Sequence, residues 1–294
     1  MCEVGEKLVI GCGYLGLRVA VRWVAQGKTV HGATRSADTA ERFRKMGIYP
    51  IVADVTDTQS LGAIGKLENI DTVLFAVGFD RSAGVPIHDV YVDGLQRVLE
   101  VLPRGIKRFV YISSTGVYGQ ADGSWVDEDS PCEPTRDGGK ACLIAEQLLR
   151  SSTFADRVIV LRLAGIYGRE RVPRKADLLS NKSFPQTGHL NLIHVEDAAA
   201  TVLAAEQLAT PPDTYVVSDG QPVPRCDYYS ELRRLLNIPA STTEEVDNIM
   251  PDGTSRKQRT PADKKIRADK FLRELKVELK FPSYREGLAA ILSE

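Results

Sequence analysis

The feature that most restricts the fold is a glycine-rich loop near the amino terminus, Gly11-Cys12-Gly13-Tyr14-Leu15-Gly16. The run 7–10 before it predicts a short buried strand, and apolar residues after it recur at helical spacing. This order of strand, glycine turn and helix is the context in which a GxGxxG motif binds a dinucleotide. Gly11 would permit the tight turn, Gly13 would let the pyrophosphate approach, and Gly16 would allow close helix packing. We therefore expect an NAD(P) site here.

Further apolar runs alternate with helical patterns along the first half of the chain. The runs that predict strands are 29–34, 72–77, 108–113 and 158–163. Strands that alternate with helices in this way indicate a parallel sheet with helices on both faces. The predicted fold class is α/β, with a Rossmann-type doubly wound parallel sheet in an NAD(P)-binding domain over residues 1–166.

Residues 167–294 predict mainly a smaller C-terminal α+β lobe that would hold the substrate. The pattern loosens into polar loops after Arg169, with helices expected from near 196 and over about 229–236. Segments from about 190 to 220 are expected to return to the first domain. Residues 251–265, rich in Lys, Arg and Thr, predict an exposed linker or loop.

The charge of the chain is balanced, with 38 basic and 39 acidic residues and a formal net charge of -1. This balance argues against a nucleic-acid or membrane partner that recognises the charge of the whole molecule. The five cysteines form no CxxC pair, so no metal site is expected. No run approaches about 18 apolar residues, and no charged segment followed by an apolar stretch opens the chain, so we expect a cytoplasmic protein.

The residue after the second strand selects between NAD and NADP in this kind of fold. An acidic side chain there would bind the ribose 2′-hydroxyl, but this chain has Thr34-Arg35-Ser36. Arg35 carries a guanidinium suited to a 2′-phosphate, and the nearest acid, Asp38, lies beyond the expected place. The sequence therefore favours NADP, while NAD bound through main-chain contacts stays open.

Several other segments carry short motifs at the ends of predicted strands. They are Ala53-Asp54-Val55, Phe75–Gly78, Tyr111–Gly119, Val160–Arg162 with Ile166–Gly168, and Ile193–Ala198. Together with the glycine loop they make the chain resemble, over essentially its whole length, the extended short-chain dehydrogenase/reductase superfamily of the NAD-dependent epimerase/dehydratase type. The resemblance implies that Asp54 lies beside the adenine and that residues 76–78 line the cofactor groove. The positions expected to contact the cofactor are Gly11, Gly13, Tyr14, Leu15, Gly16, Arg35, Ser36, Asp54, Val55, Ala76, Val77, Gly78, Lys140 and Leu163.

The resemblance also implies a catalytic set of Ser or Thr, Tyr, and Lys four residues after the Tyr. Ser114, four residues before Tyr118, matches the residue that polarises the substrate oxygen and so contacts the substrate, and Lys140 matches the lysine. The tyrosine position then falls on Arg136, a departure from the family's pattern. Because the pKa of an arginine exceeds about 12, Arg136 cannot transfer a proton near neutral pH.

Three interpretations follow from the missing tyrosine. In the first, the chain is an atypical oxidoreductase or epimerase acting on a small polar substrate, with Tyr118, Tyr167 or a water held by Ser114 as the acid. In the second, it is a catalytically silent NADP-binding sensor or regulatory module. In the third, it is a lyase or isomerase that uses bound cofactor without net turnover. Both tyrosines belong to YG turns that can be purely structural.

A basic loop follows the second YG turn, where the resemblance places the substrate. Arg169 and Arg171 could bind a phosphate of a nucleotide sugar, although a solvated charged loop explains them equally well. Basic residues after 255 lack interleaved aromatic residues, so nucleic acid is not expected as a partner. The resemblance further implies a homodimer through helices at about 88–102 and 139–151, whose second apolar faces include Val92 and Cys142.

Overall fold

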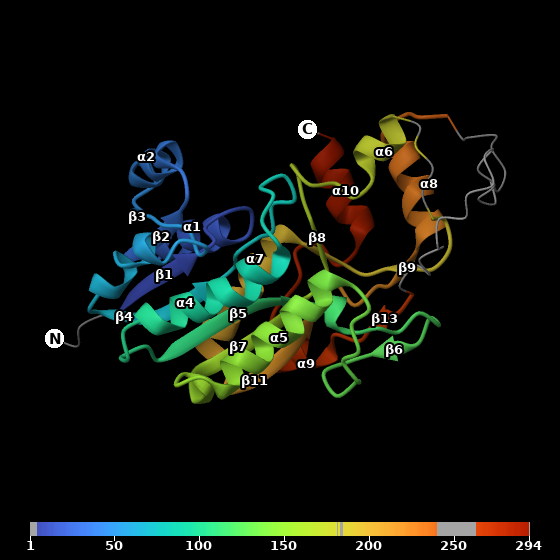
Figure 1. The fold of residues 1–294 in the computed structure, drawn as a ribbon. Coiled ribbons are helices and arrows are strands. Elements are labelled where there is room, and N and C mark those ends of the chain that lie inside the picture. The colour runs from blue at the N-terminus through green and yellow to red at the C-terminus, as the bar shows by residue number, and fades with distance from the viewer. Residues whose placement is uncertain (1–4, 181, 183–184, 240–262, 294) are drawn as a thin grey trace.

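A seven-stranded parallel sheet forms the centre of the molecule (Figure 1). The computed structural model describes residues 5–180, 182, 185–239 and 263–293. The sheet strands are β1 (Glu6–Ile10), β2 (Val30–Thr34), β3 (Tyr49–Val52), β4 (Ile70–Phe75), β5 (Arg108–Ser114), β7 (Val158–Leu163) and β11 (Asp213–Val217). Their order is β11-β7-β5-β4-β1-β2-β3, so the chain reverses its direction across the sheet between β1 and β4. In open sheets of this kind, ligands bind at the carboxyl ends of the strands at such a reversal.

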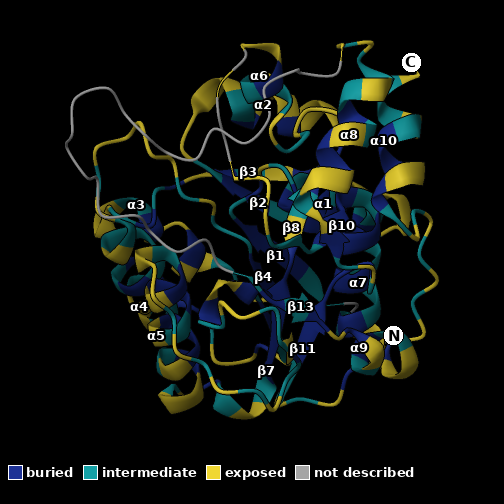
Figure 2. Cartoon of the chain, turned by 90° about the vertical axis from the view of Figure 1, so that its right-hand side faces the viewer, coloured by how far each residue is buried: buried dark blue, intermediate teal, exposed yellow. Residues whose placement is uncertain are grey.

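Helices cover both faces of the sheet, as Figure 2 shows for α3, α4 and α5 on one side and α7 and α9 on the other. One face carries α1 (Gly16–Ala25), α2 (Ala37–Lys45), α7 (Val195–Leu208) and α9 (Asp269–Glu274); the other carries α3 (Thr58–Leu61), α4 (Gly94–Val101) and α5 (Asp137–Ser151). Their apolar stripes bury Trp23 and Phe271 on the first face and Leu95 and Leu149 on the second. Burial of these stripes against the sheet is the main stabilising contribution of such a layered fold.

A second, smaller core lies beside the carboxyl ends of the sheet strands and is built from short elements. They are β8 (Gly165–Tyr167), α6 (Lys175–Leu179), β9 (His189–Leu190), β10 (Leu192–His194), β12 (Val223–Pro224), α8 (Arg225–Leu235) and α10 (Tyr284–Leu292). β10 pairs with β8 in parallel, and β12 pairs with β9 antiparallel. The remaining pieces are the η segments η1 (Ile64–Lys66), η2 (Asp89–Asp93, a π-helix), η3 (Thr115–Val117) and η4 (Ala155–Arg157), and the pair β6 (Trp125–Val126) and β13 (Lys265–Ile266).

The predicted fold class is confirmed, and the sheet contains two strands that the sequence pattern did not predict, β3 and β11. The helix expected over about 229–236 begins earlier, at Arg225. The C-terminal part is shared between the two cores, because α9 packs on the sheet whereas α10 packs in the smaller core. Most of the predicted linker, residues 251–262, lies outside the described residues, and the exact division into lobes stays a prediction. Among the described residues, no helix has the length and apolar character needed to span a bilayer.

Candidate cofactor and active site

The glycine loop joins β1 to α1 at the point where the strand order reverses. Gly11 adopts a φ of +85°, and a methyl group added there would lie 2.4 Å from the main-chain nitrogen of Val77. A methyl group at Gly16 would lie 2.5 Å from the carbonyl oxygen of Gly11. Gly13 differs, because it is exposed and no atom lies within 4 Å of a methyl group placed on it. Gly11 and Gly16 are therefore required by packing, whereas Gly13 borders open space.

The helix that follows the loop presents an uncapped amino terminus. Leu15 precedes α1 without a side-chain cap, and the first turn contains no acidic residue. Main-chain N–H groups at such a helix end favour a bound anion. The open space at Gly13 and the uncapped helix end both fit the pyrophosphate of a dinucleotide.

Arg35 and Ser36 follow β2 at the same edge of the sheet. The Arg35 guanidinium lies 3.6 Å from the Asp80 carboxylate, and both side chains are exposed. The Ser36 hydroxyl accepts the N–H of Thr39 at 3.3 Å and so begins α2. An exposed ion pair of this length contributes little free energy, so Arg35 can exchange Asp80 for another anion.

The other residues expected near the cofactor lie on the neighbouring strand ends. After β3, one oxygen of Asp54 accepts the N–H and the hydroxyl of Thr56 at 2.8 and 2.7 Å, which fixes that carboxylate. After β4, Ala76 donates its N–H to Ile10, and Gly78 has open space where a side chain would project. The loops after β1, β2, β3 and β4 therefore share one edge, together with a hollow of about 160 Å³ between α1 and α2. That hollow is lined by Cys12, Gly13, Leu17, Thr39, Arg42, Phe43 and Met46.

Ser114 ends β5, the next strand beyond β4. Its hydroxyl oxygen accepts the N–H of Gly116 at 3.0 Å, so the side chain is held in the turn after the strand. Leu163, at the end of β7, is its register partner and is buried. Ser114 is partly exposed and therefore open to a ligand on its free side.

Helix α5 approaches this turn through its main chain. A methyl group at Gly139 would lie 2.1 Å from the carbonyl oxygen of Gly116. Arg136 immediately precedes the helix and Lys140 follows one turn later, and both side chains are exposed. The α5 residue that meets the Gly116 carbonyl is thus a glycine, which brings no proton-transferring side chain.

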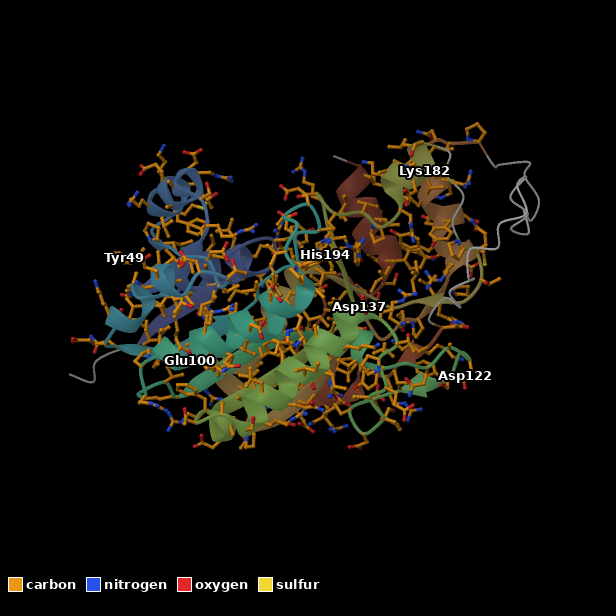
Figure 3. All side chains as sticks on the ribbon, in the orientation of Figure 1. Tyr49, Glu100, Asp122, Asp137, Lys182 and His194 are labelled. Carbon is orange, nitrogen blue, oxygen red and sulfur yellow. The ribbon has the colours of Figure 1, made fainter. Side chains whose placement is uncertain are left out.

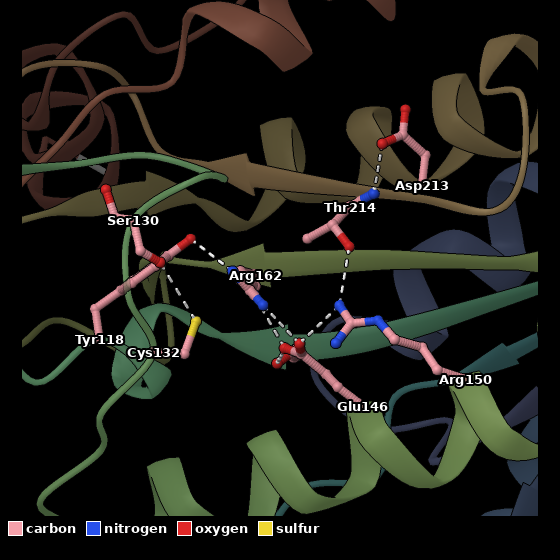
Figure 4. Close-up of polar contacts among 9 residues, drawn as sticks. Tyr118, Ser130, Cys132, Glu146, Arg150, Arg162, Asp213 and Thr214 are labelled. Atoms are coloured by element: carbon pink, nitrogen blue, oxygen red, sulfur yellow. Dashed lines mark hydrogen bonds and ion pairs between the residues drawn. The ribbon is translucent and has the colours of Figure 1, made fainter.

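Tyr118 belongs to a buried polar network below this turn (Figure 4). Glu146 binds the Arg162 guanidinium through two hydrogen bonds of 3.1 and 2.7 Å and also accepts the Ser113 hydroxyl at 2.6 Å. Arg162 donates its remaining arm to the Tyr118 hydroxyl at 2.8 Å. Tyr118 is 2% exposed, and burial raises the pKa of its hydroxyl despite the nearby guanidinium. This geometry does not favour Tyr118 as the acid.

Tyr167, the other tyrosine considered as an acid, is fully buried between β8 and the C-terminal helix. Its hydroxyl donates to the carbonyl oxygen of Ser283 at 3.3 Å. A methyl group at Gly287 would lie 2.0 Å from this hydroxyl oxygen. Burial first, and the Asp219 carboxylate second, raise the pKa of Tyr167. The structure gives Tyr167 a packing role.

The basic loop after Tyr167 lies beside the glycine loop. The Arg171 guanidinium is 5.8 Å from the centre of the Tyr14 ring, and Arg18 lies 4.5 Å from that same ring. Arg169 is exposed two residues earlier. The structure thus brings Arg171 near the expected cofactor loop, and its role toward a substrate stays a prediction.

Three residues with unusual environments were not identified from the sequence. Arg162 could have been identified from the sequence, because a charged residue within the buried strand Val158–Leu163 requires a partner. Asp219, after β11, is 5% exposed, and one of its carboxylate oxygens has no hydrogen-bond partner among the described residues. Lys264 is 8% exposed in a segment that looked solvated. Neither Asp219 nor Lys264 has a sequence pattern that distinguishes it from a surface residue.

The residues expected to face a second subunit are already covered within the chain. Val92 is 7% and Cys142 is 5% exposed, because α5 packs against the π-helix Asp89–Asp93. The expected second apolar face is therefore wrong for these two residues. A homodimer itself stays a prediction.

Comparison with known proteins places these features in a family. The model of the NAD dependent epimerase/dehydratase family matches residues 8–218. Protein YeeZ of Escherichia coli is 29% identical over 237 residues, which are 78% of this chain and 83% of that protein. A Stigmatella aurantiaca protein, 4-hydroxy-2-methyl-3-oxo-4-farnesyl-3,4-dihydroquinoline-1-oxide ketoreductase, is 26% identical over 81% of this chain and 74% of its own. The structure of a conserved protein of unknown function from Silicibacter pomeroyi matches 99% of both chains, with 28% identity and a TM-score of 0.74.

Proposed function

Because the chain belongs to the NAD-dependent epimerase/dehydratase family, we propose that it binds NADP in preference to NAD and acts on a small polar substrate without a catalytic tyrosine. The observation that carries the proposal is the glycine loop, where Gly13 opens onto space beside an uncapped helix end. Arg35, one strand further along the sheet, supplies the charge that favours the 2′-phosphate.

Ser114 is the residue best placed to polarise a substrate oxygen. Its oxygen accepts the Gly116 N–H, so the hydroxyl keeps its own proton for donation to a substrate carbonyl or hydroxyl. A bound nicotinamide would supply hydride transfer, and Lys140 would contact its ribose. The proposed class is therefore an oxidoreductase or epimerase, which is consistent with the ketoreductase among the relatives of this chain. If the substrate is a nucleotide sugar, its phosphate would lie toward Arg171.

The experiment is a fluorescence titration of wild-type protein and the Gly13→Val variant with NADPH and NADH. A Cβ atom at Gly13 has no protein atom within 4 Å, so the variant should fold normally yet lose at least about tenfold in affinity. Gly105→Val is the matched control, because Gly105 is also exposed without close neighbours but lies in the turn between α4 and β5. Unchanged NADPH binding by Gly13→Val would refute the site, and tighter binding of NADH than NADPH would refute the preference.

A second candidate function is a silent NADP-binding module, which is favoured by the glycine that α5 packs against the Ser114 turn. Deuterium transfer from labelled NADPH distinguishes the two functions. Transfer to any member of a panel of ketones and nucleotide sugars, lost in Ser114→Ala, would reject the silent module. Tight NADPH binding with no transfer to any of them would instead support it.

A further inference from the structure

The ion pair between Arg35 and Asp80 joins two loops that lie on either side of the glycine loop. Arg35 follows β2, and Asp80 lies in the loop after β4. Because β1 lies between these two strands in the sheet, their ends are about 10 Å apart with the loop after β1 between them. The 3.6 Å contact between the guanidinium and the carboxylate therefore crosses the groove in which the proposed function places a dinucleotide.

Asp80 is held in this place by contacts within its own loop. Its Oδ1 accepts the N–H of Ser82 at 3.0 Å and the Ser82 hydroxyl at 2.6 Å. The preceding residue, Phe79, packs edge-on against Tyr91, with 6.3 Å between the ring centres. These contacts leave Oδ2 as the oxygen that faces Arg35. Hydrogen bonds from Ser82 first, and the Arg35 guanidinium after them, lower the pKa of Asp80, so this side chain is ionised at neutral pH.

Arg35 has no other ion-pair partner among the described residues. A 2′-phosphate that binds Arg35 must either take the place of the Asp80 carboxylate or bind beside it. The first possibility costs the ion pair, and the second brings two anions close together. Both costs apply to NADP and not to NAD, whose 2′-hydroxyl carries no charge. The residue that opposes the 2′-phosphate is thus in contact with the residue that favours it.

We propose that Asp80 limits the preference of this protein for NADP over NAD, because it pairs with Arg35 whenever no 2′-phosphate is bound. This inference rests on the proposed function, since it concerns the selectivity of the same cofactor site. The side chains of Arg35 and Asp80 are 59% and 45% exposed, so water and salt screen the pair. The effect on affinity is therefore a few-fold.

The test is a fluorescence titration of the wild type and of the Asp80→Asn variant with NADPH and NADH. Asparagine keeps an oxygen that can accept both hydrogen bonds from Ser82 and removes only the charge, so the loop should keep its shape. The affinity for NADPH should rise about fivefold, because Arg35 no longer exchanges one anion for another. The affinity for NADH should change by less than about twofold.

Asp122→Asn is the matched control. Asp122 is exposed and accepts the N–H of the residue two positions later, Ser124, at 3.1 Å, as Asp80 does with Ser82. It forms no ion pair within the part of the chain that the structure describes. Figure 3 shows Asp122 at the opposite end of the molecule from Tyr49, which lies on β3 beside β2. Asp122→Asn should leave both affinities unchanged.

A second pair of variants tests whether Asp80 acts through Arg35. In the Arg35→Ser background, the further change Asp80→Asn should raise the affinity for NADPH by less than about twofold, because the partner of the carboxylate is already gone. An equal gain in both backgrounds would overturn the proposal, since Asp80 would then act on the phosphate without Arg35.

The outcomes separate this inference from the proposed function. Binding of both dinucleotides with an unchanged ratio of affinities in Asp80→Asn would overturn the inference alone. A wild type that binds NADH more tightly, together with an Asp80→Asn variant whose ratio shifts toward NADPH, would refute the proposed preference and support the role of Asp80. A wild type that binds neither dinucleotide would refute both.

Discussion

Replacing Asp219 with asparagine should remove a pH dependence from the stability of this protein. Asp219 lies just after β11, where its Oδ1 accepts the N–H of Gln221 at 3.0 Å and its Oδ2 has no partner among the described residues. Burial raises the pKa of Asp219 from 3.8 to about 7, against the lowering effect of that N–H, and the Asp197 carboxylate adds to the increase. The folded protein therefore holds a neutral carboxyl group up to nearly neutral pH.

The size of the effect follows from this difference in pKa. Between about pH 4 and pH 7 the unfolded chain releases the proton whereas the folded chain retains it. The free energy of unfolding then falls by about 1.4 kcal/mol for each pH unit and becomes constant above the folded pKa, a total loss of about 4 kcal/mol. Asp219→Asn keeps the shape and removes the titration. Any unpaired amide donor would cost about 1–3 kcal/mol equally at every pH.

The assay is urea unfolding from about pH 5 to pH 8, followed by circular dichroism and by the fluorescence of the buried Trp23. The variant should gain stability relative to the wild type as pH rises. Asp122→Asn is the control, because Asp122 is exposed and a hydrogen bond from Ser124 lowers its pKa, so Asp122 is ionised in both the folded and the unfolded chain over this pH range and the curve of the variant should run parallel to that of the wild type. Parallel curves for wild type and Asp219→Asn over this range would show that the reasoning is wrong.

Three other changes test the sheet, the loop and the cofactor preference. Arg162→Met leaves the Glu146 carboxylate buried without its main partner and should lower the free energy of unfolding by about 3–5 kcal/mol. Urea denaturation measures this loss, and a loss below about 1 kcal/mol would contradict the prediction. Gly16→Ala forces a methyl group against the carbonyl of Gly11 and should cost about 1–3 kcal/mol in the same assay, so an unchanged midpoint would argue against the close helix packing. Arg35→Ser should lower the ratio of NADPH to NADH affinity about tenfold in the fluorescence titration, as loss of about 1.4 kcal/mol implies, and an unchanged ratio would remove Arg35 from the 2′-phosphate site.

The sheet was predictable where strands are long and apolar, as at Val158–Leu163, and where glycines follow a strand, as at 11–16. β3 was missed because it has four residues, includes Pro50, and exposes Tyr49 at 59% and Val52 at 52%, so it has neither the length nor the pattern of a buried strand. Elements of two or three residues in the smaller core have no periodicity to detect.

That the residues expected to bind the cofactor would lie at one edge of the sheet was predictable, because they follow successive strands of a parallel sheet; their contacts with a cofactor stay a prediction. The buried environment of Lys264 could not be predicted from the sequence, because it depends on contacts with Asn191 and Tyr118, which are distant in the chain. The spacing rule that placed a tyrosine equivalent at Arg136 also gave no indication that Gly139 would meet the Gly116 carbonyl in the turn. Contacts of this kind arise from tertiary packing and not from local preference.

The packing of α9 on the sheet has a consequence for synthesis on the ribosome. Phe271 and Leu275, both nearly fully buried, cover β11 and complete an apolar core whose other helices were made much earlier. During translation, the face of the sheet around Tyr215 and Val217 therefore stays uncovered until the chain has been made to residue 275 and this part has left the exit tunnel. A ribosome that stalls before this point would hold a nascent chain whose first domain is largely formed but still exposes an apolar surface, which is the kind of surface that chaperones bind.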